Sequence, residues 1–313
     1  MENSGEQQPV VRVLGAGAGG GSPQWNCNCE ICKRVRDGDG PRRTQTSLAV
    51  SADGRRWALI NASPDLREQI AKTPSLHPQH SGRHSPIEAV VLTGGEVDQV
   101  TGLLTMREGE PFSVYASGSV HETLAQSPIF DALDRETVPR RSMQLDETTE
   151  IAGADGQKLG ISVTAFSVPG KVPLYEETPG ETPEIGVETE DNVALRVDLG
   201  ETHFFFVPGC ADITPGLKER LQGAPLVFFD GTLWSDDELV DAGLTEKTGQ
   251  RMGHVSISGD GGVLESFSDA DIERKVLIHI NNSNPVLLDD TEERQTVEAA
   301  GWDVAYDGWT IEL

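Results

Sequence analysis

Lysine is scarce in this sequence. Among 313 residues there are 7 lysines, and lysine and arginine together number 25 against 51 aspartates and glutamates, which gives a formal net charge of −26. Most of the acidic excess lies after residue 100, where there are 14 basic and 40 acidic side chains. Nonspecific binding to nucleic acid and to anionic membranes relies on cationic side chains, so we expect neither kind of partner. A well-solvated acidic surface accounts for the charge, and adaptation to salt is the alternative.

Long apolar runs are absent as well. No segment approaches the ~20 apolar residues that a helix needs to span a bilayer, and residues 1–6 lack the basic and then apolar pattern of a signal peptide. We therefore expect a cytoplasmic protein that does not insert into a membrane. Because no linker stands out, we predict a flexible N-terminus over residues 1–10 and a single domain over residues 11–313, with residues 176–190 as a long surface loop.

Strands dominate the predicted secondary structure, and helices fall between groups of strands. This order favours an α/β fold in which two sheets pack together and helices flank them. The last two strands are predicted to form a hairpin around Asp307-Gly308 and to close a sheet that the first strands begin. The predicted strands are residues 10–14, 47–51, 56–60, 89–93, 112–115, 161–168, 193–198, 203–207, 226–230, 275–280, 302–306 and 310–313, and the predicted helices are residues 65–72, 100–106, 120–126, 268–273 and 291–300.

A glycine-rich run follows the first predicted strand. Residues 15–20, Gly-Ala-Gly-Ala-Gly-Gly, match the G-x-G-x-x-G pattern. A dinucleotide site would require a helix to begin there, but the next residues, "GSPQWNC", include Pro23 and cannot continue a helix well. We therefore favour glycines that allow close backbone packing or a close approach to a site.

Three of the four cysteines, Cys27, Cys29 and Cys32, fall within six residues. In a protein expected in the cytoplasm, adjacent thiols favour metal binding over a disulfide. Zinc binds thiolates tetrahedrally, and a structural site has four protein ligands. The fourth ligand must then come from a distant segment, where Cys210 and the histidines are candidates. Ordinary reduced cysteines in a loop remain the alternative.

Polar residues stand at the ends of two very apolar strands. His279 ends one of them and precedes Asn281-Asn-Ser-Asn284, while Asp230 ends the other. Binding groups gather at such strand ends, although a buried histidine or a helix-capping aspartate would look the same. His254 follows a loop that contains glycine and threonine, and it is either a proton donor near neutral pH or an ordinary loop histidine.

Several segments together resemble the pyrroloquinoline quinone biosynthesis protein B family. The resemblance runs from about Val11 to Leu313, and "PQWNCNC" and "HINNSNP" are its most specific motifs. It implies a metallo-β-lactamase-like αββα sandwich of two mixed sheets flanked by helices. It also implies a part in making the redox cofactor pyrroloquinoline quinone (PQQ) from a ribosomal peptide, through iron-dependent hydroxylation of the tyrosine ring in a cross-linked Glu–Tyr precursor. A carrier that helps to move PQQ or its precursor toward the periplasm is the alternative, and a homodimer is a further expectation.

The metal motif of that superfamily, Thr-His-x-His-x-Asp-His-x-x-Gly, would cover residues 93–102, which read "TGGEVDQVTG". One metal would need side chains at Gly94, at Glu96 and near Pro169, so the resemblance implies that this position is lost. Hydrolysis by two metals needs both positions, and we therefore do not expect a hydrolase. The other metal would use four side chains, namely Asp98, Gln99, Asp230 and His279.

With a histidine at position 99, as the resemblance implies for the family, the set would be two histidines and two carboxylates, which suits a single Fe(II) that keeps open positions for oxygen and substrate. Gln99 stands where the family usually has a histidine, and because an amide is a weak oxygen donor we expect iron to bind less tightly, with Glu96 as an assisting carboxylate. We assign His254 to proton transfer or to a substrate contact, and Lys171 to a substrate carboxylate.

The cysteine cluster is similar to the structural zinc loop of related phosphodiesterases. There the fourth ligand lies three residues after the last active-site histidine, and in this chain that position is Asn282. The resemblance therefore implies a structural Zn²⁺ held by Cys27, Cys29 and Cys32, with Asn282 at the position of the fourth ligand.

Overall fold

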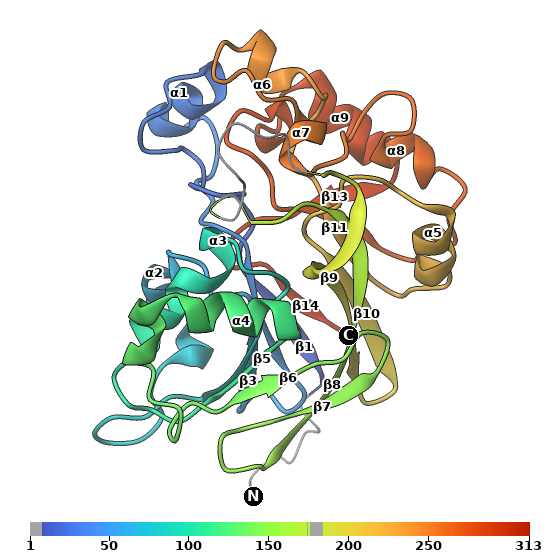
Figure 1. Ribbon diagram of the computed structural model, residues 1–313. Helices are drawn as coiled ribbons and strands as arrows, with labels where there is room; N and C mark the ends of the chain where they lie inside the picture. The colour runs from blue at the N-terminus through green and yellow to red at the C-terminus, as the bar shows by residue number, and fades with distance from the viewer. Residues whose placement is uncertain (1–7, 174, 176–183) are drawn as a thin grey trace, which may run out of the picture.

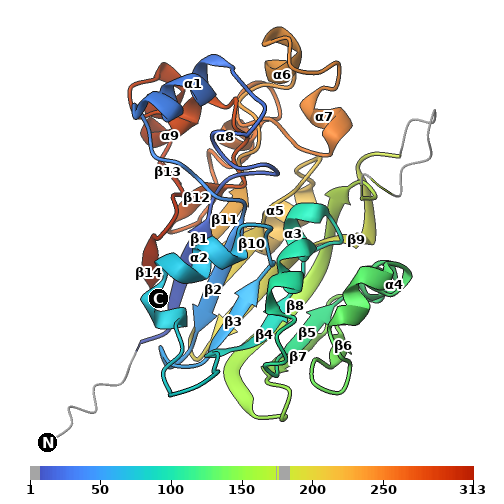
Figure 2. The ribbon, with the colours of Figure 1, turned by 90° about the vertical axis from the view of Figure 1, so that its left-hand side faces the viewer.

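Two packed β-sheets form the centre of the molecule, and helices cover both outer faces (Figure 1, Figure 2). The structure is a computed structural model that describes residues 8–173, 175 and 184–313. Each sheet has seven strands and contains both parallel and antiparallel neighbours. The predicted αββα sandwich of two mixed sheets is confirmed.

The first sheet has the strand order β14-β1-β2-β3-β4-β5-β6. The strands β14, β1, β2 and β3 pair antiparallel, and β3 to β6 continue in parallel. Its central strands are buried on both faces, which explains their nearly continuous apolar sequences. The strands are β1 (Val10–Gly15), β2 (Ser47–Ser51), β3 (Trp57–Ile60), β4 (Ile87–Val91), β5 (Ser113–Ala116), β6 (Arg140–Ser142) and β14 (Thr310–Glu312).

The second sheet has the order β13-β12-β11-β10-β9-β8-β7. Its long antiparallel strands lead into parallel strands at β10, so the carboxyl ends of β10, β11 and β12 lie along one edge. The strands are β7 (Thr148–Ala152), β8 (Lys158–Gly170), β9 (Val187–Leu199), β10 (Thr202–Val207), β11 (Val227–Asp230), β12 (Lys275–Ile278) and β13 (Trp302–Val304).

Three hydrophobic clusters hold these layers together. One fills the space between the sheets and includes Val11, Leu195 and Phe206, and the other two lie beneath the helices on the outer faces. Among the described residues, no helix is long and apolar enough to cross a bilayer. The helices are α1 (Glu30–Asp37), α2 (Leu66–Lys72), α3 (Val97–Val100), α4 (Gly118–Gln126), α5 (Pro215–Leu221), α6 (Glu238–Asp241), α7 (Gly249–Met252), α8 (Val263–Ser266) and α9 (Glu292–Ala299).

The prediction for the end of the chain was wrong in one respect. The strands β13 and β14 do not form a hairpin, because β13 pairs with β12 in the second sheet and β14 pairs with β1 in the first. The turn between them crosses from one sheet to the other: the amide of Ala305 donates to Leu277, while that of Gly308 donates to Val13. Only β14 closes the sheet that the first strands begin.

Two predicted helices also differ. Residues 268–273 form a turn and an irregular segment, since the helix in this region, α8, lies earlier at Val263–Ser266. The predicted helix at residues 100–106 is a 3₁₀ helix over Thr101–Met106. Of the predicted surface loop, residues 176–183 lie outside the described residues, as do residues 1–7 of the predicted flexible N-terminus, and β9 already begins at Val187.

Candidate metal centre

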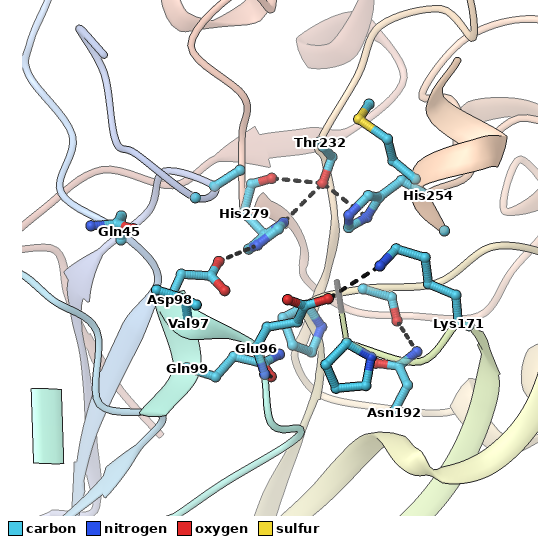
Figure 3. A pocket seen from close by; sticks show the side chains of 18 of the residues that line it. Gln45, Glu96, Val97, Asp98, Gln99, Lys171, Asn192, Thr232, His254 and His279 are labelled. Carbon is cyan, nitrogen blue, oxygen red and sulfur yellow. Dashed lines mark hydrogen bonds and ion pairs between the residues drawn. The ribbon is translucent and has the colours of Figure 1, made fainter. Parts of the chain in front are cut away.

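The sequence-predicted polar residues converge where strands of the two sheets end. Asp230 is the last residue of β11, and His279 directly follows the neighbouring parallel strand β12, with Asp230 in register with Ile278. Asp98 comes from α3, after the end of β4 in the other sheet. Figure 3 shows Asp98 and His254 on either side of His279, around one pocket.

Asp230 is fully buried and is fixed by several hydrogen bonds. Its Oδ2 accepts from the backbone N–H of Cys210 at 2.9 Å and lies 2.7 Å from Nδ1 of His254. Its Oδ1 accepts from the backbone N–H of Thr232 at 3.0 Å and from the Thr232 hydroxyl at 2.6 Å. A buried carboxylate with this many donors is held in one orientation.

His279 adopts a left-handed backbone conformation, with φ of 60°, which is uncommon for a residue other than glycine. Its Nε2 lies 3.1 Å from Oδ2 of Asp98, and its Nδ1 lies 2.9 Å from the hydroxyl of Thr232. The ring stacks on that of His254 with 5.2 Å between centroids. Sequence reasoning missed Thr232, and its place two residues after the strand-ending Asp230 was the only available signal.

The ionised forms of these side chains stabilise one another. Burial by itself raises the pKa of Asp98, but the hydrogen bond and positive charge of His279 outweigh it and keep the pKa below its usual value. Burial likewise opposes the charge of Asp230, and the charge and hydrogen bond of His254 lower its pKa. For His279 the desolvation is outweighed by Asp98 and Asp230, so its pKa is raised.

The donor set fits a single metal ion. Asp230, His254 and His279 each offer one ligand atom, and these three atoms lie within 4.8 Å of one another. Asp98 joins the group through its 3.1 Å contact with Nε2 of His279. Two imidazoles and two carboxylates are a suitable set for a divalent transition metal. A metal would replace the protons that these acids and imidazoles share in its absence.

Gln99 has a different environment from that expected of a ligand. Its Oε1 accepts from the backbone N–H of Glu96 at 3.1 Å, and its Nε2 donates to the hydroxyl of Thr93 at 3.4 Å. The amide therefore caps the first turn of α3. A Cβ atom at Gly94 would lie 2.5 Å from Oε1 of Gln99 and 2.9 Å from the backbone oxygen of Asp191. The Gln99 amide and the Asp191 backbone thus occupy the space that a side chain at residue 94 would need.

Glu96 and Lys171 form an ion pair at the pocket, with 3.2 Å between Oε1 and Nζ. Lys171 also donates to the backbone oxygen of Val172 at 3.0 Å. The negative charge of Glu96 contributes to the raised pKa of His279, so this carboxylate is electrostatically coupled to the donor set. The cavity that these residues line has a volume of about 710 Å³, which lies within the range of small-molecule sites.

The three clustered cysteines lie at the start of α1. Cys29 is the N-cap residue, and its sulfur accepts from the backbone N–H of Cys32 at 3.4 Å. The sulfur of Cys27 accepts from the N–H of Cys29 at 3.5 Å, and that of Cys32 accepts from the N–H of Gln24 at 3.4 Å. One ligand atom from each cysteine lies within 4.8 Å of the others. Backbone amides that point at sulfur favour the thiolate form, which zinc requires.

Asn282 is the fourth residue at this cluster. Its Nδ2 lies 3.2 Å from the sulfur of Cys32, and its backbone oxygen accepts from the thiol of Cys29 at 3.8 Å. Burial raises the pKa of Cys29 to about 12, whereas the hydrogen bonds from Cys29, Cys32 and Asn282 outweigh burial and lower the pKa of Cys27. Cys210, one of the candidates for a fourth ligand, lies elsewhere, and its thiol donates to the backbone oxygen of Asp212 at 3.0 Å.

The glycine-rich run packs closely against neighbouring backbone. Gly17 makes isolated β-bridges to Gln45 and to Ile280, and a Cβ atom at Gly15 would lie 2.2 Å from the backbone oxygen of Gln45. The first helix after the run begins only at Glu30. The close-packing interpretation therefore holds, and the helix that a dinucleotide site requires is not formed at this run.

These features define a member of a large superfamily. The family model described as "Beta-lactamase superfamily domain" matches residues 56–280. The fold of that superfamily agrees with the sandwich described above.

Closer relatives identify the family. The chain is 56% identical over 301 residues to coenzyme PQQ synthesis protein B of Gluconacetobacter diazotrophicus, which covers 96% of this chain and 98% of the relative. It is 54% identical over 304 residues to that of Gluconobacter oxydans, covering 97% and 98%. The crystal structure of Zn²⁺-bound PqqB from Methylobacterium extorquens matches with a TM-score of 0.92 and 48% identity, covering 97% of this chain and 100% of the other. The chain belongs to the coenzyme PQQ synthesis protein B family.

Proposed function

We propose that the protein is an iron-dependent oxygenase in PQQ synthesis, which hydroxylates the tyrosine ring of the cross-linked Glu–Tyr precursor derived from a ribosomal peptide. The observation that carries this proposal is the donor set at the pocket, in which ligand atoms of Asp230, His254 and His279 lie within 4.8 Å of one another and Asp98 contacts His279. Non-haem Fe(II) oxygenases combine histidine and carboxylate ligands with open positions for oxygen and substrate. The membership of the family supports the precursor as substrate.

The surroundings of Gly94 argue against hydrolysis. A two-metal hydrolase holds both metals with separate ligands, but here Gly94 has no side chain and Gln99 fills the neighbouring space. The metal position that would use residue 94 therefore has no side-chain ligand at that residue, which favours a single metal in the pocket.

The protein's own residues hold the donor atoms in place. The backbone N–H groups of Cys210 and Thr232 orient Asp230, and the Thr232 hydroxyl contacts Nδ1 of His279, which leaves Nε2 directed toward Asp98. Such outer partners fix the orientation and basicity of metal ligands. We assign His254 to the donor set, because its Nδ1 lies 2.7 Å from Asp230.

Asp98, Asp230, His254 and His279 would hold Fe(II), which would supply the activation of O₂ for this hydroxylation. The ring C–H would become C–OH with one oxygen atom, and the other oxygen atom would leave as water with two electrons and two protons from an external reductant such as ascorbate. We assign Lys171 to a carboxylate of the precursor, and the position of its ammonium group at the pocket beside Glu96 supports this role. Glu96 stays outside the close donor cluster and acts through its charge.

We also propose a structural zinc ion at Cys27, Cys29 and Cys32, with Asn282 completing the site. The crystal structure of the relative from Methylobacterium extorquens contains Zn²⁺, and the hydrogen bonds to sulfur described above support the same ion here.

The function is tested with the full chain loaded with Fe(II), the cross-linked precursor, O₂ and ascorbate. Mass spectrometry should show one added oxygen atom on the tyrosine ring, and Asp230→Asn should abolish it. His80→Gln is the matched control, because His80 is exposed and lies outside the pocket. Binding of the unmodified precursor without turnover by the iron-loaded chain would instead support the carrier function.

A further inference from the structure

Five glycines line the pocket, and three of them have a structural reason to be glycine. Gly20 and Gly253 have φ values of 93° and 88°, which side-chain-bearing residues rarely adopt. A Cβ atom at Gly170 would lie 2.4 Å from Nδ2 of Asn192. The other two, Gly19 and Gly209, have neither a left-handed backbone nor a close neighbour.

The space next to Gly19 and Gly209 borders the donor set. A Cβ atom at Gly19 would have Oδ2 of Asp98 as its nearest neighbour, at 3.7 Å. A Cβ atom at Gly209 would lie 3.6 Å from Cε1 of His254. Both distances are ordinary van der Waals contacts, so the folded chain itself would accept alanine at either position. The added methyl group would, however, occupy pocket space beside a candidate metal ligand.

The two positions flank the site. Asp98 and His254 lie on either side of His279 (Figure 3), so Gly19 and Gly209 border the donor set next to its two outer members. Both positions also line the pocket.

We propose that Gly19 and Gly209 are specificity-determining residues, which leave room for a flat aromatic ring to lie against the donor set while a carboxylate of the same molecule contacts Lys171. That the ligand is aromatic rests on the proposed function, whereas the steric requirement rests on the positions of the two glycines. A small ligand does not need this space, so the requirement should depend on ligand size.

The experiment compares Gly19→Ala and Gly209→Ala with the parent chain, all loaded with Zn²⁺ and Fe(II) without oxygen. Gly216→Ala is the matched control, because Gly216 is exposed in α5, its nearest neighbour would be Oγ1 of Thr214 at 3.9 Å, and it lies outside the pocket. Calorimetry measures the Kd of 3,4-dihydroxybenzoate, a flat ring with a carboxylate, and the Kd of acetate as the small probe. Metal content and Tm are measured on every variant.

The two pocket variants should keep their metals and Tm, bind acetate as the parent does, and bind 3,4-dihydroxybenzoate about tenfold or more weakly, as a pocket does when one methyl group intrudes. The control should bind both probes unchanged. Unchanged ring binding in the pocket variants would overturn the proposal, as would equal weakening of both probes or failure of the parent to bind the ring. A parent chain that binds the ring but adds no oxygen to the precursor would contradict the proposed function and leave the steric proposal standing.

Discussion

Replacing Gln99 distinguishes a helix-capping role from the metal-ligand role that the sequence predicted, because the two roles have opposite consequences. In Gln99→Ala the backbone N–H of Glu96 loses its acceptor at 3.1 Å, and Thr93 loses a longer contact at 3.4 Å. Glu96 is only partly buried, so water can take over that N–H, and the loss should be about 1 kcal/mol, typical of a helix cap. With an unfolding entropy of roughly 2 cal/mol/K per residue, a chain of this length should lose about 2 °C in Tm.

The same substitution should leave metal affinity nearly unchanged, because the four donor residues Asp98, Asp230, His254 and His279 remain. The assay is competition of the Fe(II)-loaded chain with a chelator, with Asp98→Asn as the variant that should lose metal. If Gln99→Ala releases iron as readily as Asp98→Asn does, Gln99 is a metal ligand and the capping role is insufficient. A large loss of stability with normal metal content would show that the hydrogen bonds of Gln99 stabilise the fold by more than a helix cap does.

Four further substitutions test other parts of the structure. His254→Ala should lower iron content; if iron stays bound while turnover falls, His254 transfers protons instead, as the sequence suggested. Thr232→Val removes the hydroxyl that contacts both Asp230 and His279, and it should weaken iron binding by about 10- to 100-fold in chelator competition, whereas unchanged affinity would contradict its orienting role. Cys27→Ser should lose one zinc per chain by elemental analysis and keep the iron, and unchanged zinc would refute the assignment. Burial outweighs the hydrogen bonds from Ser283 and Trp234 and raises the pKa of Glu238 from 4.5 to about 7, so its contribution to stability is full below pH 4.5 and is lost as the pH rises through 7. In urea unfolding, the free energy of unfolding of Glu238→Gln relative to that of the parent should therefore rise by about 2 to 3 kcal/mol between pH 5 and pH 8. A difference that does not change with pH would refute this.

The strands and the ends of the strands were predictable because their signals are local. Apolar β-branched runs predict β11 and β12, and a charged or imidazole side chain at the tip of such a run has few explanations other than a partner or a site, which is why Asp230 and His279 could be chosen. His254 was noticed, but its position beside Asp230 depends on how the loop between β11 and β12 folds back. Nothing in its neighbouring residues encodes that contact.

Pairing and side-chain direction are the parts that sequence could not supply. A turn such as Asp307-Gly308 fits a hairpin and a crossing between sheets equally well, because either connection needs the same short reversal. Gln99 illustrates the same limit for a site: its position in the motif predicts a ligand, whereas its rotamer directs the amide to the backbone of Glu96. The packing around Gly94, which involves the distant Asp191, determines this rotamer of Gln99.

One short segment connects the two candidate metal sites. His279 contributes to the donor set, Asn282 contacts the cysteine cluster, and Ile280 between them is held by hydrogen bonds to Ala16 and Ala18 of the glycine-rich run. The uncommon backbone conformation of His279 persists only if the surrounding chain is fixed, and the cysteine cluster contacts Asn282, three residues further on. A metal at the cysteines would therefore support the geometry of His279 without touching the substrate. On this view the motifs at residues 23–32 and 279–285 form one structural unit, in which the cysteine cluster supports the backbone that carries His279.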